Sequence, residues 1–272
     1  MIALPYAELH AFPDGDAPHT GNPAGVMVLT APMSDADRLG IASSNNLSET
    51  AFLEASGEAD LWRLRWFTPG VEVDLCGHAT LASAVWLFEE GHVAGDTARF
   101  DTRSGILSVT RAGIDRYAMD LPAIGYKPAD AAPEAIAALG AGAPEAAFDI
   151  ERVHGARYQM LVYGDEAIVA GLRPDISALK AAGINVIAAA PGASADVVSR
   201  FFAPASGVDE DPVTGSAHAT LAPYWAQRLG RQTLTARQIG PRPGALEMTL
   251  GGNGRVTLTG TARRYLDGVV RV

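Results

Sequence analysis

Residues 77–82 read Gly-His-Ala-Thr-Leu-Ala, and residues 217–222 read Ala-His-Ala-Thr-Leu-Ala. These two stretches match at an offset of 140 residues, and the likeness extends outward from them at an offset of 139. The further pairs are Trp86 and Trp225, Gly91 and Gly230, residues 104–107 and 243–246, and Arg116 and Arg255. A steady offset over about 40 residues indicates two structural copies of one unit. Two copies that face each other would form a cleft, where small-molecule sites usually lie.

Composition limits the classes of partner. The chain has 272 residues, of which 48% are hydrophobic, so each half can build its own core. The net charge of -10 argues against nucleic acid, which binds basic surfaces. We find no apolar run long enough for a membrane span and no signal-peptide pattern at residues 1–5. The sequence therefore predicts a cytoplasmic protein with neither a nucleic-acid nor a membrane partner.

Familiar cofactor signatures are missing from the sequence. The single cysteine, Cys76, excludes an internal disulfide, and the two lysines, Lys127 and Lys180, are poor candidates for a Schiff base. The six histidines show no metal-ligand spacing. Glycine-rich phosphate or dinucleotide motifs and the esterase elbow are also absent. We therefore expect an enzyme with no cofactor and no metal.

The spacing of apolar residues predicts several strands and one very apolar helix in each half. Strands are expected at residues 4–12, 26–29, 48–54, 61–67, 98–121 (a meander), 152–163, 167–170, 186–190, 197–202 and 245–259 (a second meander). Helices are expected at residues 34–46, 77–91, 133–139, 175–182 and 216–228, and a loop at residues 19–25. This pattern favours an α+β class, with a curved sheet wrapped around a helix in each half.

The domain boundaries follow from the duplication and from composition. We expect an N-terminal lobe over residues 1–120 and a C-terminal lobe over residues 149–264. Residues 121–148, rich in Ala, Gly and Pro, are expected to form a linker region. The last strand, residues 265–272, is expected to return to the first lobe.

Both copies of the apolar helix begin with a glycine-containing turn, Cys76-Gly77 and Gly215-Ser216. Free backbone N–H groups at a helix start, together with the helix dipole, attract an anion such as a substrate carboxylate. The alternative is that glycine merely begins the helix in each copy.

Glu49 is a carboxylate within an otherwise apolar strand. Burial would raise the pKa of a carboxyl group toward neutrality, as a general base for proton abstraction from carbon requires. The alternative is an exposed position on an amphipathic strand.

Further polar residues lie near the two helix starts. His78 follows Cys76 by two positions, which suits either a thiol nucleophile or a packed cysteine beside a helix-capping histidine. Asp211 ends a run of three acids that suits a solvated loop or a site. Ser216 suits an N-cap or a substrate contact. His218 suits a structural role.

Five motifs carry a resemblance to a known family. They are residues 21–26 (Gly-Asn-Pro-Ala-Gly-Val), 47–52 (Leu-Ser-Glu-Thr-Ala-Phe), 67–69 (Phe-Thr-Pro), 74–80 (Asp-Leu-Cys-Gly-His-Ala-Thr) and 210–218 (Glu-Asp-Pro-Val-Thr-Gly-Ser-Ala-His). Together they resemble the phenazine-biosynthesis PhzF family, in order over nearly the whole chain. The resemblance implies a diaminopimelate-epimerase-like fold with two pseudo-symmetric domains and an active site between them. It also implies a homodimer.

The resemblance also implies roles for individual residues. Glu49 corresponds to the family's acid/base glutamate, and His78 to its active-site histidine. Asp211 and Ser216 correspond to its aspartate and serine. The remaining matches, Gly77 and Gly215, resemble the positions whose backbone amides meet the substrate.

One departure concerns cysteine. Related racemases use two thiols, one on each face of the substrate carbon, whereas this chain has only Cys76. We expect Ala217 at the equivalent position in the second copy. A racemisation that needs two thiols is therefore excluded, and a proton shuttle through one carboxylate remains.

The sequence thus predicts a cofactor-independent isomerase that moves a proton within a small carboxylic acid, with Glu49 in an interdomain cleft. One alternative is a non-catalytic protein that binds a small acid on the same scaffold. A second alternative is a thiol enzyme that uses Cys76 with His78.

Overall fold

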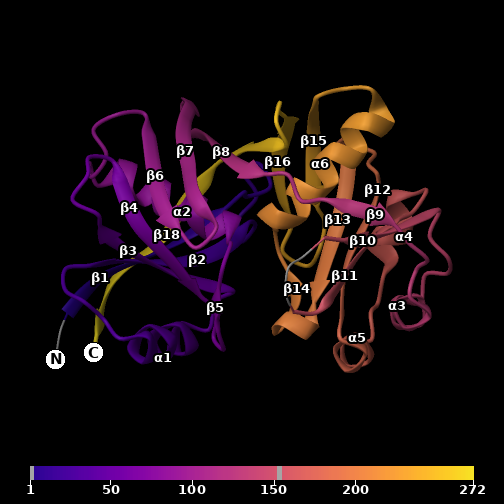
Figure 1. The fold of residues 1–272 in the computed structure, drawn as a ribbon, viewed down its shortest axis with the longest axis horizontal. Coiled ribbons are helices and arrows are strands. Elements are labelled where there is room, and N and C mark those ends of the chain that lie inside the picture. Colours follow the sequence, from indigo (N-terminus) through magenta and orange to yellow (C-terminus); the bar gives the residue numbers. More distant parts are fainter. Residues whose placement is uncertain (1–2, 152–154) are drawn as a thin grey trace. The chain divides into compact units, whose positions relative to one another are not determined.

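The structure is a computed structural model that describes residues 3–151 and 155–272. The chain forms two compact units (Figure 1). The first comprises Met1–Leu121 and Thr257–Val272, and the second comprises Pro122–Val256. Each unit pairs a sheet with one long buried helix, as the duplication in the sequence predicted.

The first unit is built on a curved sheet in the order β18–β1–β2–β3–β4–β6–β7–β8. Its β2–β3 and β4–β6 pairs are parallel, the other pairs are antiparallel, and the short β5 is antiparallel to β4. The strands are β1 (Ala3–Ala11), β2 (Asn22–Leu29), β3 (Glu49–Ala55), β4 (Leu61–Phe67), β5 (Glu72–Val73), β6 (Thr97–Thr102), β7 (Gly105–Gly113), β8 (Arg116–Pro122) and β18 (Ala262–Arg271).

The second unit repeats this arrangement in the order β9–β10–β11–β12–β13–β15–β16. From β10 onward the directions alternate as they do from β1 onward: antiparallel, parallel, antiparallel, parallel, antiparallel. The short β14 pairs with β13 as β5 pairs with β4. The strands are β9 (Tyr126–Pro128), β10 (Ala146–Ile150), β11 (Arg157–Val162), β12 (Ile184–Pro191), β13 (Val197–Ala203), β14 (Val208–Asp211), β15 (Thr233–Gln238) and β16 (Gly244–Leu250). The strand β17 (Arg255–Gly260) begins in the second unit and continues into the first, which resumes at Thr257.

One long helix lies against each sheet: α2 (Gly77–Glu89) in the first unit and α6 (Gly215–Leu229) in the second. Every residue of α2 from Gly77 to Phe88 is buried, and the helix contacts β1, β2, β3, β6, β7 and β18. A helix that is apolar on all sides must be enclosed, so the sheet curves around α2 into a barrel-like, unclosed layer. The predicted α+β class is confirmed. No helix in the described part of the chain is long and apolar enough to cross a membrane.

The expected linker is wrong, because residues 122–148 belong to the second unit. β9 pairs antiparallel with β10, and α3 (Pro133–Leu139) buries Ala135 and Leu139 in that unit's core. Small side chains allow α3 to approach its neighbours closely, so a composition rich in alanine here reflects packing.

Residues 257–264 were expected in the C-terminal lobe but belong to the first unit. In Figure 1 the yellow β18 runs within that unit, where it pairs with β1.

Two local predictions are also corrected. Residues 167–170, expected as a strand, lie in α4 (Glu166–Gly171), because the Asp165 carboxylate accepts a hydrogen bond from the Ala167 N–H at 2.6 Å and caps a helix start. The expected loop at residues 19–25 is shorter, since β2 already begins at Asn22. Part of the strand expected at 152–163, namely residues 152–154, lies outside the described residues.

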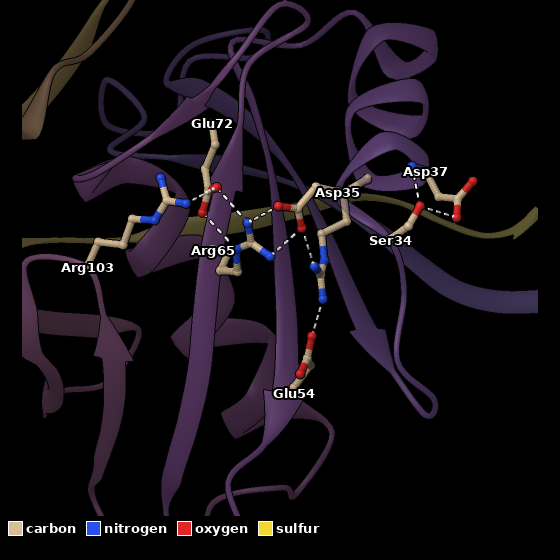
Figure 2. A network of polar contacts seen from close by, with 8 residues as sticks. Ser34, Asp35, Asp37, Glu54, Arg65, Glu72 and Arg103 are labelled. Carbon is tan, nitrogen blue, oxygen red and sulfur yellow. Dashed lines mark hydrogen bonds and ion pairs between the residues drawn. The ribbon is translucent and has the colours of Figure 1, made fainter.

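The helix α1 (Asp35–Asn45) is tied to the sheet by a network of charged groups (Figure 2). The Arg65 guanidinium in β4 lies between two carboxylates, donating to Asp35 at 2.6 and 3.0 Å and to Glu72 at 2.7 and 2.6 Å. Arg38 of α1 donates to Asp35 at 3.0 Å and also to Glu54 of β3. Forked contacts of this kind fix the orientation of the helix as well as its position. The remaining helix, α5 (Ile176–Ala182), precedes β12 in the second unit.

Candidate active site

Glu49 is the first residue of β3, and the parallel register sets it opposite Ala24 of β2. Its side chain is only 14% exposed. The alternative that Glu49 is an exposed strand residue is therefore wrong. The strand start directs the carboxylate toward the N-terminal end of α2, where His78 lies.

His78 is the second residue of α2, and its Nε2 lies 3.3 Å from Oε2 of Glu49. The two atoms are at ion-pair distance but are not aligned as a hydrogen bond. Burial lowers the pKa of His78 to about 3, opposed by the hydrogen bond that the protonated ring donates to the Pro23 backbone. The imidazole is therefore neutral at pH 7. Contacts between catalytic groups commonly tighten only when substrate binds.

Two further side chains meet the other ring nitrogen of His78. Nδ2 of Asn22 lies 3.1 Å from Nδ1, and Sγ of Cys76 lies 3.5 Å from it. Asn22 in turn accepts a hydrogen bond from Ser48 Oγ at 3.4 Å. The site in the first unit therefore combines a carboxylate, a neutral imidazole, a thiol and a buried amide.

Three of these groups are close enough to ligate one metal ion. Ligand atoms of Glu49, Cys76 and His78 all lie within 4.8 Å of one another. The spacing of the histidines in the sequence does not reveal this set, because only the fold brings together one histidine, one cysteine and one carboxylate.

The two long helices begin in the same way. Cys76 and Thr214 are the N-caps, both in extended conformation, and Gly77 and Gly215 follow as the first helical residues. The carbonyl of each N-cap accepts the first helical N–H bond at 3.2 Å. The structural partner of Cys76 is therefore Thr214, and the expected equivalence with Ala217 is wrong. The conclusion that the second copy has no thiol at this position is unchanged.

The correspondence between the N-caps Cys76 and Thr214 also assigns a structural role to His218. Thr80 Oγ1 donates to the Cys76 carbonyl at 2.6 Å, and His218 Nδ1 donates to the Thr214 carbonyl at 2.8 Å. His218 thus stands where Thr80 stands in the first copy, two positions beyond the place of His78. Burial lowers its pKa to about 4, so the ring is neutral. The repeated histidines of the sequence are therefore not equivalent in the structure.

Asp211 ends β14 and is buried, with a relative exposure of 9%. Its Oδ2 accepts a hydrogen bond from the Thr214 hydroxyl, which is thereby turned away from capping α6. The fully buried Gln238 fixes this segment, since its Oε1 accepts from the Thr214 N–H at 2.9 Å and its Nε2 donates to the Asp211 carbonyl. The solvated-loop alternative for Asp211 is wrong.

The predicted site residues thus gather at two helix starts, one in each unit. Glu49, Gly77 and His78 lie at the start of α2, and Asp211, Gly215 and Ser216 lie at the start of α6. The sequence analysis assigned no role to Asn22, Ser48 or Gln238. A signal existed for the first two, since both stand in the motifs that carry the resemblance. For Gln238 the sequence offers none.

Comparison with known proteins agrees with this architecture. Residues 9–268 match the family model described as phenazine biosynthesis-like protein, PhzC-PhzF. An uncharacterized isomerase of Pseudomonas aeruginosa is 46% identical over 94% of this chain and 95% of its own. The human phenazine biosynthesis-like domain-containing protein is 36% identical over 92% of this chain and 93% of its own.

Solved structures show the same fold. A PhzF-family protein from Enterococcus faecalis superposes with a TM-score of 0.88 at 42% identity, over 100% of both chains. A hydroxyproline epimerase from Agrobacterium vitis superposes with a TM-score of 0.66 at 14% identity, over 98% of this chain and 92% of its own, which supports the fold alone. The chain belongs to the phenazine biosynthesis-like PhzF family.

Proposed function

We propose that this chain is an isomerase that moves a proton within a small carboxylic acid, using Glu49 as general acid/base and no cofactor. The observation that carries the proposal is the 3.3 Å approach of the Glu49 carboxylate to the buried, neutral ring of His78. Two relatives in Pseudomonas aeruginosa, 46% and 43% identical, are named isomerases, which supports the reaction class.

The proposed chemistry balances within the substrate. The Glu49 carboxylate removes a proton from an acidic carbon, and the electron pair delocalises into the substrate's unsaturated or carboxyl group. The protonated carboxyl then returns the proton to another carbon, so no redox partner is needed. A positioned acid/base group of this kind contributes about 10²–10⁴-fold in rate.

Binding of the substrate carboxylate is assigned to the helix starts. The amides of Gly77 and Gly215 lie at the positive ends of α2 and α6, and neither N-cap side chain accepts a hydrogen bond from the helix backbone. We assign Ser216 to the same binding role. Asp211, held by Thr214 and Gln238, assists proton transfer or orients the substrate.

Deuterium exchange tests the proposal directly. The protein is incubated in D₂O with a panel of cyclic and unsaturated carboxylic acids, and deuterium incorporation is followed by proton NMR. Wild type is expected to exchange one carbon-bound proton of its substrate, and Glu49→Gln to lose that exchange. A ligand that binds tightly without exchange in wild type would favour the non-catalytic binding protein instead.

A thiol enzyme is the second candidate, because Cys76 Sγ lies 3.5 Å from Nδ1 of His78. It requires the thiol as the reacting group. Cys76→Ser removes the nucleophile while keeping a hydrogen-bonding group of similar size. Full loss of turnover in that variant, with exchange retained in Glu49→Gln, would favour this candidate.

A further inference from the structure

Asn22 is held rigidly at a turn into β2. Gly21 before it has a φ of 81°, and a Cβ there would approach the Ala11 carbonyl oxygen to 2.7 Å, so only glycine fits. Asn22 then pairs with Ala11 across the β1–β2 ladder. Its side chain is fully buried, and its Nδ2 lies 3.1 Å from Nδ1 of His78.

The contacts of Asn22 favour one position for the proton of the neutral His78 ring, in competition with the Pro23 backbone, to which the protonated ring donates. An amide nitrogen can only donate, so His78 Nδ1 must accept. Ser48 Oγ donates to the other end of the amide at 3.4 Å, in agreement with this orientation. The Cys76 thiol, a weak donor, approaches the same Nδ1 at 3.5 Å. A neutral imidazole carries one proton, and a donor at Nδ1 favours its place on Nε2, the nitrogen that faces Glu49.

We propose that Asn22 is a positioning residue of the proton-transfer site, which holds His78 in the tautomer that presents Nε2–H to the Glu49 carboxylate. This inference rests on the function proposed above. In the opposite tautomer the Nε2 lone pair would face a carboxylate oxygen 3.3 Å away, and the two would repel. With the proton on Nε2, the positive end of the N–H dipole lies near the carboxylate and stabilises its ionised form, which is the form that accepts a proton from carbon.

The same tautomer bears on the metal-ligand cluster of Glu49, Cys76 and His78. With Nε2 protonated and Nδ1 accepting from Asn22, the ring offers no lone pair to an ion between the three groups. A metal would have to displace the amide contact or the Nε2 proton. Asn22 thereby favours proton transfer over metal binding at this cluster.

The tautomer is measured directly by two-dimensional ¹H–¹⁵N NMR of the imidazole rings in protein labelled with ¹⁵N-histidine. Wild-type His78 is expected to show an unprotonated Nδ1. His218 is an internal standard of the opposite kind, because its Nδ1 donates to the Thr214 carbonyl. An Nδ1–H signal from His78 in wild type would overturn the proposal without any variant.

Asn22→Asp then tests the consequence, because a carboxylate at this place accepts and should draw the proton to Nδ1. We expect His78 to change tautomer, His218 to stay unchanged, and kcat to fall at least about tenfold with a smaller change in KM. Asn45→Asp is the matched control: that amide donates to Thr50 Oγ1 at 3.1 Å in the same unit, and its change should leave both readouts unaltered. Asn22→Ser, which keeps a donor, is expected to retain the Nε2–H tautomer and more activity than Asn22→Asp.

The outcomes separate this inference from the proposed function. Retained exchange in Glu49→Gln would end the proposed function. Loss of exchange in Glu49→Gln, together with full activity in an Asn22→Asp protein whose tautomer has changed, would end the inference alone. If Asn22→Asp fails to fold, two measurements still test the inference about Asn22. They are the tautomer of His78 in wild type and the kinetic comparison of Asn22→Ser with Asn45→Asp.

Discussion

Nε2 of His78 lies 3.3 Å from Oε2 of Glu49, joining the second residue of a helix to the first residue of a strand. Neither element could hold this geometry alone. The parallel β2–β3 register fixes Glu49, and the burial of α2 inside the curved sheet fixes His78.

Glu49→Gln is expected to lower kcat/KM by about 10²–10⁴-fold while the melting temperature stays near that of wild type. The amide keeps the shape of the carboxylate but cannot accept a proton from carbon. Steady-state kinetics and thermal unfolding measure the two quantities. Glu58→Gln, at an exposed glutamate beyond β3, is the control and should change neither. Wild-type rates in Glu49→Gln would contradict the assignment.

Cys76→Ser is expected to keep most of the activity, within about tenfold of wild type. The hydroxyl still approaches His78 Nδ1 as a donor, so the Nε2–H tautomer survives. Kinetics with the same substrate measure the effect. A loss as large as that of Glu49→Gln would instead give the thiol a direct part in the reaction.

Gln238→Leu is expected to lower the free energy of unfolding by about 1–3 kcal/mol, because the buried Thr214 N–H and Asp211 carbonyl lose their partner. Activity should also fall, since the segment carrying Asp211 is released. Gln159→Leu is the matched control: it is equally buried in the same unit and accepts from the Ala132 N–H at 2.8 Å.

Urea denaturation and kinetics distinguish the two variants. Both should lose comparable stability, but only Gln238→Leu should lose activity well beyond the loss of stability. Equal activity in the two variants would remove Gln238 from the support of the site.

His218→Asn is expected to make stability less sensitive to acid. Burial lowers the pKa of His218 from 6.5 to about 4, so between these values the unfolded chain binds more protons than the folded one. Wild type therefore loses stability as pH falls from 6.5 to 4, by on the order of 3 kcal/mol from this residue. The His218→Asn variant should not show this part of the stability loss, because asparagine does not bind a proton in this pH range.

Denaturation at several pH values between 7 and 4 measures the difference in slope. His19→Asn is the control, because His19 is exposed and its φ of 57° suits asparagine. Its slope should match that of wild type. A His218→Asn slope equal to the wild-type slope would contradict the buried neutral ring.

Asp35→Asn is expected to lower the melting temperature at pH 5 and much less at pH 2. Hydrogen bonds from Arg65, together with its charge, hold the pKa of Asp35 at about 2 instead of 3.8. The carboxylate therefore stabilises the fold above pH 3.8, and this contribution is lost as pH falls toward 2. Thermal unfolding of both proteins at the two pH values tests it. A difference as large at pH 2 as at pH 5 would contradict the charge network of Figure 2 as its source.

Most residues of the candidate site could be predicted from the sequence. The polar motifs around Glu49, His78, Asp211 and Ser216 stand out against apolar surroundings, and the resemblance assigned their roles. The sequence match between residues 77–82 and 217–222 aligns the two histidines, and this alignment does not hold in the structure. The capping hydrogen bonds instead align Cys76 with Thr214. In this stretch, the alignment that matches identical side chains therefore differs by two residues from the alignment that matches the backbone hydrogen bonds.

By itself, the sequence determined the duplication, the α+β class and the apolar helix in each unit, since these depend on local patterns of apolar residues and turns. The tertiary structure decided which polar groups meet. Asn22, Glu49 and His78 come from three elements, and their contacts depend on strand register and on the depth of α2 in the sheet. It also decided that residues 122–148 pack as part of a domain, because burial depends on shape as much as on composition. Such contacts are long-range, and no local pattern of residues encodes them.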